Sequence, residues 1–411
     1  MSSRSMPWLS RRALLKAGGG AVGALAIGGA LPTRAQLSPT VDRDARLSPL
    51  VRRIVRSPEN TYFTYPHSNG FMPDGRAVLA SPTQATKGVP GLAFIAFDPK
   101  TGDVQPLCHV RDTRMYWSIS DNGIMLLSQR EGAAVVDLNH RNPSPRRILD
   151  ERNWTVHGDN DISGDGKWAL LTLSRHIVPK AYRTIMVETA TGRIITIMAP
   201  GWSMDHAHFS PFDQSWISLC ANRTNRDPER MWVWHAESAP RGRQVFKQTT
   251  LAGTFFHVGH ERAMFHKPAI LTIAYGTSSA TPRGLYAVGF DGTVKLISES
   301  NRDLHCNISR DGTWAVVSLQ GRYAQKELRP TPDWLNSEGK FGFTDVVAIN
   351  MASGRRAFLH EGTNAATGQP YEVQPSISPD GKWVLLKDAR EQRVLFLEID
   401  QLGLQRLINQ R

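Results

Sequence analysis

The chain has 411 residues, a formal net charge of +12 and 21% charged residues, a composition that suits a globular protein. Its lysines and arginines form no cluster interleaved with aromatic residues, which disfavours a nucleic-acid-binding surface. The three cysteines, Cys108, Cys220 and Cys306, include no Cys-x-x-Cys pair, which argues against a structural zinc site, and we expect them to be buried thiols.

Residues 1–35 are predicted to be a twin-arginine (Tat) signal peptide. Ser10–Lys16 matches the twin-arginine motif, Ala17–Leu31 is apolar and rich in Gly and Ala, and Thr33–Ala35 resembles a cleavage site. The apolar run is shorter than the roughly 20 residues that a membrane-spanning helix needs. We therefore predict that a bacterium exports the folded protein, which is then periplasmic or secreted and has no membrane span after signal removal.

Removal of this segment would take away five basic residues and no acidic ones, which lowers the formal charge from +12 to +7. A positive balance of this size suits an acidic ligand, such as a glycan acid.

One short pattern recurs through residues 36–411. A turn, most often Asp-Gly, precedes a run of aliphatic, aromatic and β-branched residues, which is typical of a tight turn followed by a strand. The copies are Met72–Leu79, Ser120–Leu127, Ser163–Leu170, Ser210–Ile217, the degenerate Phe265–Leu271, Ser309–Val316 and Ser378–Leu385.

A second strand pattern with its own turn follows several copies, as at Leu92–Gly102, Thr184–Gly192, Leu285–Gly292 and Val346–Gly354. Repetition at roughly 40–50 residues is typical of a β-propeller, with one four-stranded blade per repeat. We predict that residues 36–411 form a single all-β domain, a seven-bladed β-propeller. The polar segment 322–343 in the longest gap is expected to be a loop insertion.

Polar residues precede several of these turns, and corresponding offsets in a ring place them near the central channel. They are His67, Asn160 and Asp161, His206 and His208, His257 and His260, His305, and the pair Glu372 and Gln374. Such a cluster could hold a hard or borderline divalent cation. For each residue taken alone, a hydrogen-bonded position at the start of a strand is the alternative.

From about Asn60 onward, the chain resembles the oligogalacturonate lyases, which are seven-bladed propeller pectate lyases. The motifs that carry this resemblance occur in the same order in both. They are Asn60–Phe63 with Phe71–Gly75, Asp205–Asp213, Leu219–Cys220 with Asp227–Trp232, Gly259–Glu261, Leu304–Gly312, and Gln369 with Pro375–Pro379.

The resemblance implies that His260 is the catalytic base and that Arg230 lies against the substrate. An arginine fork suits a carboxylate, and a salt bridge to a nearby acid is the alternative for Arg230. We predict that His206 and His208 bind the substrate.

The resemblance further implies a metal site formed by His305, Gln369, Glu372 and Gln374. Glu372 and Gln374 stand where the family has two histidines, and this oxygen-rich set favours calcium, magnesium or manganese. We predict manganese, with a site that binds no metal as the alternative.

These expectations define an exported polysaccharide lyase of pectin degradation that cleaves uronate-containing oligosaccharides by β-elimination. The alternative is a non-catalytic propeller that binds an acidic glycan or a periplasmic protein partner. The lyase interpretation requires Arg230, His260 and His305 to converge on one site.

Overall fold

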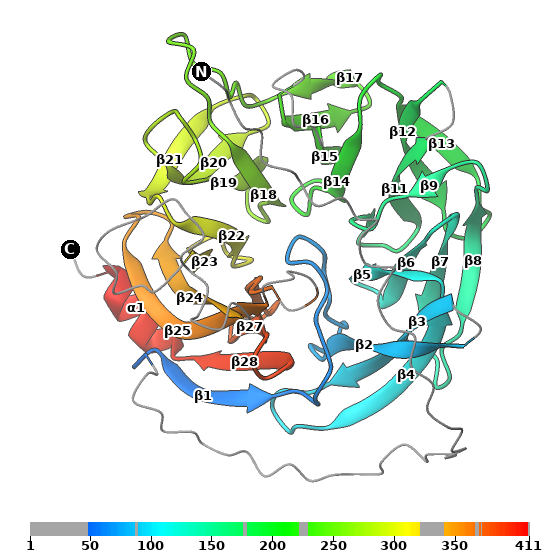
Figure 1. Ribbon diagram of the computed structural model, residues 1–411, viewed down its shortest axis with the longest axis horizontal. Coiled ribbons are helices and arrows are strands. Elements are labelled where there is room, and N and C mark those ends of the chain that lie inside the picture. Colours follow the sequence, from blue (N-terminus) through cyan, green and yellow to red (C-terminus); the bar gives the residue numbers. More distant parts are fainter. Residues whose placement is uncertain are drawn as a thin grey trace, which may run out of the picture. The chain divides into compact units, whose positions relative to one another are not determined.

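The computed structural model describes residues 48–86, 89–175, 179–221, 229–320, 341–365, 370 and 372–409. Within these residues the strands form seven antiparallel sheets that follow one another around a ring, and Figure 1 shows this arrangement. The prediction of a seven-bladed β-propeller is confirmed. The predicted signal peptide, most of the predicted loop insertion, and Gln369 lie outside the described residues.

The first three blades contain β2 (Ala77–Thr86), β3 (Val89–Phe97) and β4 (Val104–Arg111); then β5 (Thr113–Ile119), β6 (Ile124–Gln129), β7 (Gly132–Asp137) and β8 (Pro145–Asp150); then β9 (Thr155–Val156), β10 (Asp161–Ile162), β11 (Trp168–Arg175), β12 (Ala181–Glu188) and β13 (Ile194–Met198).

The next three contain β14 (Met204–Phe209), β15 (Trp216–Ala221), β16 (Met231–His235) and β17 (Ala239–Gln244); then β18 (Val258–Ala263), β19 (Ala269–Ala274), β20 (Gly284–Gly289) and β21 (Val294–Glu299); then β22 (Asp303–Ile308), β23 (Trp314–Leu319), β24 (Phe341–Asn350) and β25 (Arg356–Ala365).

The last blade joins the two ends of the propeller. Its sheet order is β1-β28-β27-β26, so that β1 (Val51–Arg56) pairs with β28 (Arg393–Ile399), beside β27 (Trp383–Asp388) and β26 (Ser376–Ile377). Ile54 faces Leu397 across this pairing. A strand from the start of the domain therefore closes the ring on a blade made from its end.

The recurring turn joins the first and second strands of a blade. In the third blade, Ser163 Oγ donates to Asp165 Oδ1 at 2.7 Å, and the Trp168 amide donates to Ser163 Oγ at 3.0 Å. Gly166 follows the aspartate with φ +70°, a conformation that glycine adopts without a steric penalty. The same bonds recur around Ser309 and Ser378. Each repeat thus fixes one turn and the buried strand after it.

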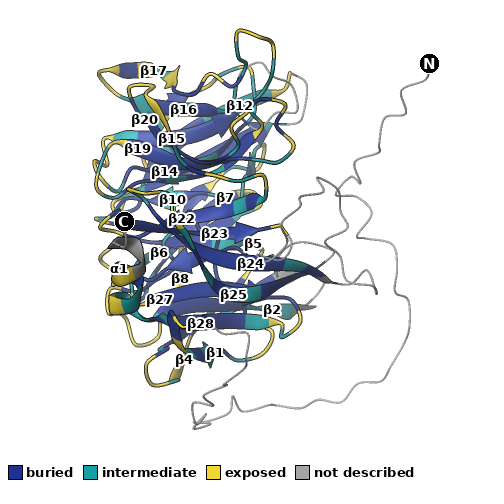
Figure 2. Cartoon of the chain, turned by 90° about the vertical axis from the view of Figure 1, so that its left-hand side faces the viewer, coloured by how far each residue is buried: buried dark blue, intermediate teal, exposed yellow. Residues whose placement is uncertain are grey.

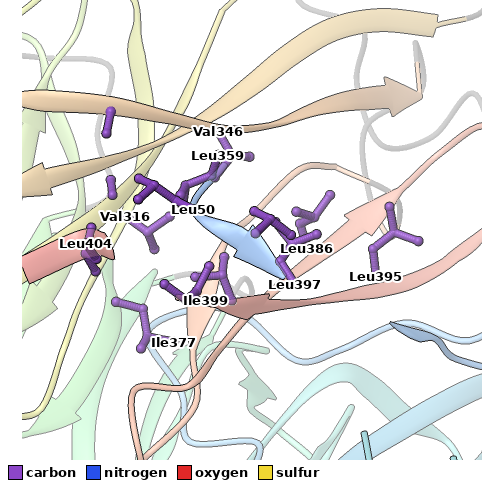
Figure 3. Close-up of a cluster of buried hydrophobic side chains, with 14 of the residues drawn as sticks. Leu50, Val316, Val346, Leu359, Ile377, Leu386, Leu395, Leu397, Ile399 and Leu404 are labelled. Carbon is purple, nitrogen blue, oxygen red and sulfur yellow. The ribbon is translucent and has the colours of Figure 1, made fainter. Parts of the chain in front are cut away.

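Apolar side chains fill the spaces between neighbouring blades. Figure 2 shows that the strands are largely buried, whereas the connecting loops carry most of the exposed residues. Figure 3 shows one cluster, in which Val316 and Leu359 of the sixth blade pack with Leu386 and Leu397 of the last. Leu404 of the one helix in the described part, α1 (Gln401–Asn409), joins this cluster. The blades therefore hold one another in place mainly through apolar contacts.

Ile54 of the closing strand belongs to the same cluster and is 6% exposed. Ile54→Ala is expected to lower the free energy of unfolding by about 2–4 kcal/mol, because it removes buried methyl groups and leaves a cavity. Urea denaturation would measure this loss. An equal loss for Ile194→Ala, which is 42% exposed, would argue against a special contribution from the closing strand.

Among the described residues, no helix is long and apolar enough to cross a membrane. The three cysteines are unpaired, and Cys220 and Cys306 are buried while Cys108 is partly buried. Burial raises the pKa of the Cys108 thiol to about 11, so that this thiol is protonated at neutral pH. The expectation of buried thiols is confirmed for Cys220 and Cys306, whereas Cys108 is only partly buried.

Candidate active site

The first strand of each blade lies nearest the ring axis, and these strands carry most of the predicted site residues. The loop between β1 and β2, drawn in blue in Figure 1, runs into the centre of the ring. It brings two aromatic residues that join the site. The residues that line the site near the axis are Tyr65 and His67 from this loop, His206 and His208 on β14, His260 on β18, His305 on β22, and Glu372 and Gln374 just before β26.

Three successive first strands share an irregularity beside the predicted histidines. The pairing register shifts between Asp205 and His208, between Gly259 and Arg262, and between Asp303 and Cys306, as in a β-bulge. His206 and His260 occupy the left-handed region there, with φ +50° and +57°. This conformation is uncommon for residues other than glycine, although histidine adopts it more often than most, and it is concentrated at functional sites. The bulges therefore single out two of the predicted histidines.

His260 is held in the tautomer that a general base needs. Its Nδ1 lies within hydrogen-bond distance of the Leu304 carbonyl oxygen and 2.9 Å from the Tyr275 hydroxyl. Because a carbonyl oxygen only accepts, Nδ1 carries the proton and the lone pair is on Nε2. Burial lowers the pKa of His260 well below its ordinary value, and His305 lowers it further, so that His260 is neutral at neutral pH.

His305 lies against His260. The two ring centroids are 3.7 Å apart, and the planes are inclined by 32°. Burial, followed by the charge of Lys387, lowers the pKa of His305 to about 3. Two imidazoles in such contact cannot both be charged at low cost, and here both are neutral.

Arg230 makes a two-pronged ion pair with Glu261, the residue after His260. Its Nε donates to Glu261 Oε1, and its Nη2 donates to Oε2 at 3.1 Å. Burial alone would raise the pKa of Glu261, but the charge of Arg230 and its hydrogen bonds outweigh this effect and lower the pKa to about 2. The salt bridge considered as the alternative for Arg230 is therefore present, and it holds the guanidinium beside the His260 segment. His260 and His305 are in direct contact, and Arg230 is joined to the same segment through Glu261.

Three of the four predicted metal ligands also come together. His305 Nε2 lies 3.9 Å from Glu372 Oε1 and 3.4 Å from Gln374 Nε2, and Gln374 Nε2 lies 3.3 Å from Glu372 Oε2. The fourth, Gln369, is not among the described residues.

A buried lysine contacts this group. Lys387 on β27 is 1% exposed, and its Nζ donates to Gln374 Oε1 at 2.7 Å. Burial lowers the pKa of Lys387 to about 7, while the charges of Glu372 and Asp159 act in the opposite direction. Because Lys387 engages the amide oxygen, the amide NH₂ group faces His305 and Glu372. A metal ion between those two residues would need the oxygen there, so the residues in this arrangement do not fit a divalent ion.

A second group of side chains could hold a metal ion. One ligand nitrogen from each of His67, His206 and His208 lies within 4.8 Å of the other two. Asp159 and Asp205 form a similar group with His206. The predicted substrate contacts His206 and His208 differ in exposure, since His206 is partly buried and His208 is only 3% exposed.

The sequence interpretation missed several members of this site. Glu261 and Tyr275 hold Arg230 and His260, and neither carried a signal beyond its residue type. Lys387 did carry a signal in the sequence, because it directly follows the apolar run Trp383–Leu386. All residues of that strand are buried. His67 was recognised by its offset before the first turn, which is like those of the other histidines, but it was given no role.

No protein-family profile matches the chain, and no curated protein matches it. Solved structures do. An oligogalacturonate lyase in complex with manganese is 16% identical with a TM-score of 0.70, over 90% of this chain and 98% of that chain. An oligogalacturonate lyase from Vibrio parahaemolyticus is 16% identical with a TM-score of 0.69, over 89% of this chain and 97% of that one.

A more distant neighbour is the β-propeller domain of the Trilobed protease from Pyrococcus furiosus. It is 12% identical with a TM-score of 0.51, over 84% of this chain and 96% of that chain. At such identities the likeness establishes a shared fold. The chain therefore shares its propeller fold with these two oligogalacturonate lyases.

Proposed function

We propose that the protein is an exported polysaccharide lyase that cleaves uronate-containing oligosaccharides by β-elimination. The observation that carries this proposal is the state of His260. The ring is neutral, and its Nδ1 donates to the Leu304 carbonyl oxygen. The next residue, Glu261, is paired with Arg230. The fold shared with oligogalacturonate lyases supports an oligosaccharide as substrate.

β-Elimination at a uronate removes the proton on C5, which is only weakly acidic beside an ionised carboxylate. His260 Nε2 would take this proton as the C4–O bond breaks and the C4–C5 double bond forms, and the departing oxygen would gain a proton from water. A neutral imidazole with a fixed tautomer suits this step near neutral pH.

Negative charge accumulates on the substrate carboxylate as the C5 proton leaves. In this proposal the Arg230 guanidinium, which is held by Glu261, would stabilise this charge beside the base. Lys387 supplies a second cationic group next to His305, in the position where the family resemblance implied a metal. Manganese or a similar borderline ion, which we propose, could be held by His305, Glu372 and Gln374 only if the Gln374 amide turned its oxygen toward the other two residues and released Lys387. An ion bound there would polarise such a carboxylate as a Lewis acid.

The test is an assay of purified protein for a new ultraviolet-absorbing unsaturated uronate. We expect this product with oligogalacturonate or a related uronate oligosaccharide. Binding of acidic oligosaccharides without any such product, across a panel of uronates and linkages, would replace the lyase by the non-catalytic alternative.

We also propose that residues 1–35 direct export of the folded protein through the twin-arginine route. Replacing both Arg11 and Arg12 with lysine is expected to retain the protein in the cytoplasm of a bacterial host, because this route reads the paired arginines. Cell fractionation with immunoblotting would measure the change. Arg4→Lys, outside the motif, is the matched control, and periplasmic recovery of the double variant would contradict the proposal.

A further inference from the structure

Three histidines meet near the ring axis from opposite sides of the propeller. His67 comes from the loop between β1 and β2, whereas His206 and His208 lie on β14 of the fourth blade. The ring centroid of His67 is 5.7 Å from that of His206 and 5.9 Å from that of His208. Their nearest ligand nitrogens lie within 4.8 Å of one another.

These imidazoles are buried without the hydrogen bonds that buried polar groups normally make. His67 is 1% exposed and His208 is 3% exposed, and neither ring nitrogen of either residue has a hydrogen-bond partner among the described residues. His206 Nδ1 also lacks one there. Unsatisfied buried groups are rare in native proteins, and a cluster of them indicates a bound ion or ligand.

Carboxylates lie just outside the three rings. Asp161 Oδ2 is 3.8 Å from His208 Nδ1, and Asp159 Oδ2 is 3.7 Å from His206 Nε2. Asp161 is fixed by bonds from the Ser118 hydroxyl at 2.5 Å and the Phe209 amide at 3.1 Å. Carboxylates in this position orient metal-bound histidines and balance the charge of the ion.

We propose that His67, His206 and His208 form a binding site for a borderline divalent transition-metal ion, with zinc as the preferred probe. Three imidazoles with an adjacent carboxylate are ligands that such ions favour over calcium or magnesium. Bonds of about 2.0–2.1 Å to zinc bring the nitrogens to about 3.4 Å from one another, which small rotations of the rings would achieve.

This site is separate from the residues around Lys387. None of its three ligands is His305, Glu372 or Gln374. A bound ion would tie the loop that carries Tyr65 and His67 to β14 on the other side of the axis. The His67 ring lies 6.4 Å from the His260 ring. The ion would therefore hold His67 in a fixed position beside the proposed base. This role replaces the substrate contact predicted for His206 and His208.

The experiment measures metal content in the mature chain after loading with Zn²⁺ and dialysis. We expect about one zinc per chain, a raised Tm because the ion binds only the folded state, and with Co²⁺ a visible spectrum typical of nitrogen ligands. His208→Ala and His67→Gln are each expected to weaken zinc binding at least about tenfold. Circular dichroism would verify that each variant is folded.

Gln374→Ala is the matched control, because it removes a ligand of the other predicted site and should retain the zinc. Loss of zinc in Gln374→Ala but not in His208→Ala would overturn the proposal, as would wild-type protein that binds no zinc or gives no Co²⁺ spectrum. The outcome is independent of the proposed lyase activity, since zinc content is read without substrate.

Discussion

His260→Ala is expected to reduce kcat/KM for formation of unsaturated uronate by about 10²- to 10⁴-fold, the usual contribution of a general base. The variant removes the Nε2 lone pair while leaving the Arg230–Glu261 pair in place. Continuous ultraviolet absorbance with an oligogalacturonate substrate measures the loss, and circular dichroism verifies the fold.

His257→Ala is the matched control, because His257 lies on the same segment and is exposed, with its Nδ1 bonded to Thr277 at 2.7 Å. We expect its kcat/KM to stay within about twofold of wild type, as a surface substitution that removes no group of the reaction. Equal activity of His260→Ala and wild type would remove His260 from the mechanism.

Glu261→Gln is expected to lower the free energy of unfolding at pH 7 by about 3 kcal/mol, because it leaves the Arg230 guanidinium without its buried counter-charge. The Glu261 side chain is 7% exposed and that of Arg230 is 23% exposed, so solvent screens the pair only weakly. Chemical denaturation of both proteins measures the difference.

The same pair predicts a pH dependence. The pKa of Glu261 falls from its ordinary value of 4.5 to about 2 in the folded protein. A depressed carboxyl pKa contributes stability that is present above pH 4.5 and lost as the pH falls toward 2. The stability difference between wild type and Glu261→Gln should therefore shrink across that range.

Asp150→Asn provides the comparison for both measurements. Asp150 pairs with Arg147 at 3.1 Å, but the two side chains are 49% and 51% exposed, and such surface pairs contribute about 1 kcal/mol or less. If Glu261→Gln cost no more than Asp150→Asn, the Arg230–Glu261 pair would not be a major contribution to stability.

The seven blades could be predicted because their signal is local. Ser163, Asp165 and Gly166 complete a turn through bonds that span at most five residues, and the same letters return in other blades. The degenerate copy near Phe265 was still recognisable because its strand, β19, keeps a continuous apolar run. A turn that is closed by bonds between near neighbours can be recognised from its own residues, without knowledge of the rest of the chain.

The candidate site was only partly predictable because its geometry depends on distant elements. The offsets before the turns identified His206, His260 and His305, but not the bulges that give His206 and His260 their left-handed backbone. Nothing in the sequence links Lys387 to Gln374, which lies just before β26, or His67 to His208 across the axis. These contacts arise only when the blades have packed.

The pairing of β1 with β28 has a consequence for biosynthesis. The Ile54 and Leu397 partners are separated by most of the domain, so β1 leaves the ribosome long before the strand that it pairs with is made. Until then its backbone groups form an unpaired edge that can associate with other chains. Pairings between such distant segments also form slowly. The edge of β1 therefore stays unpaired until the ring is complete, and aggregation is expected to compete with folding during that interval.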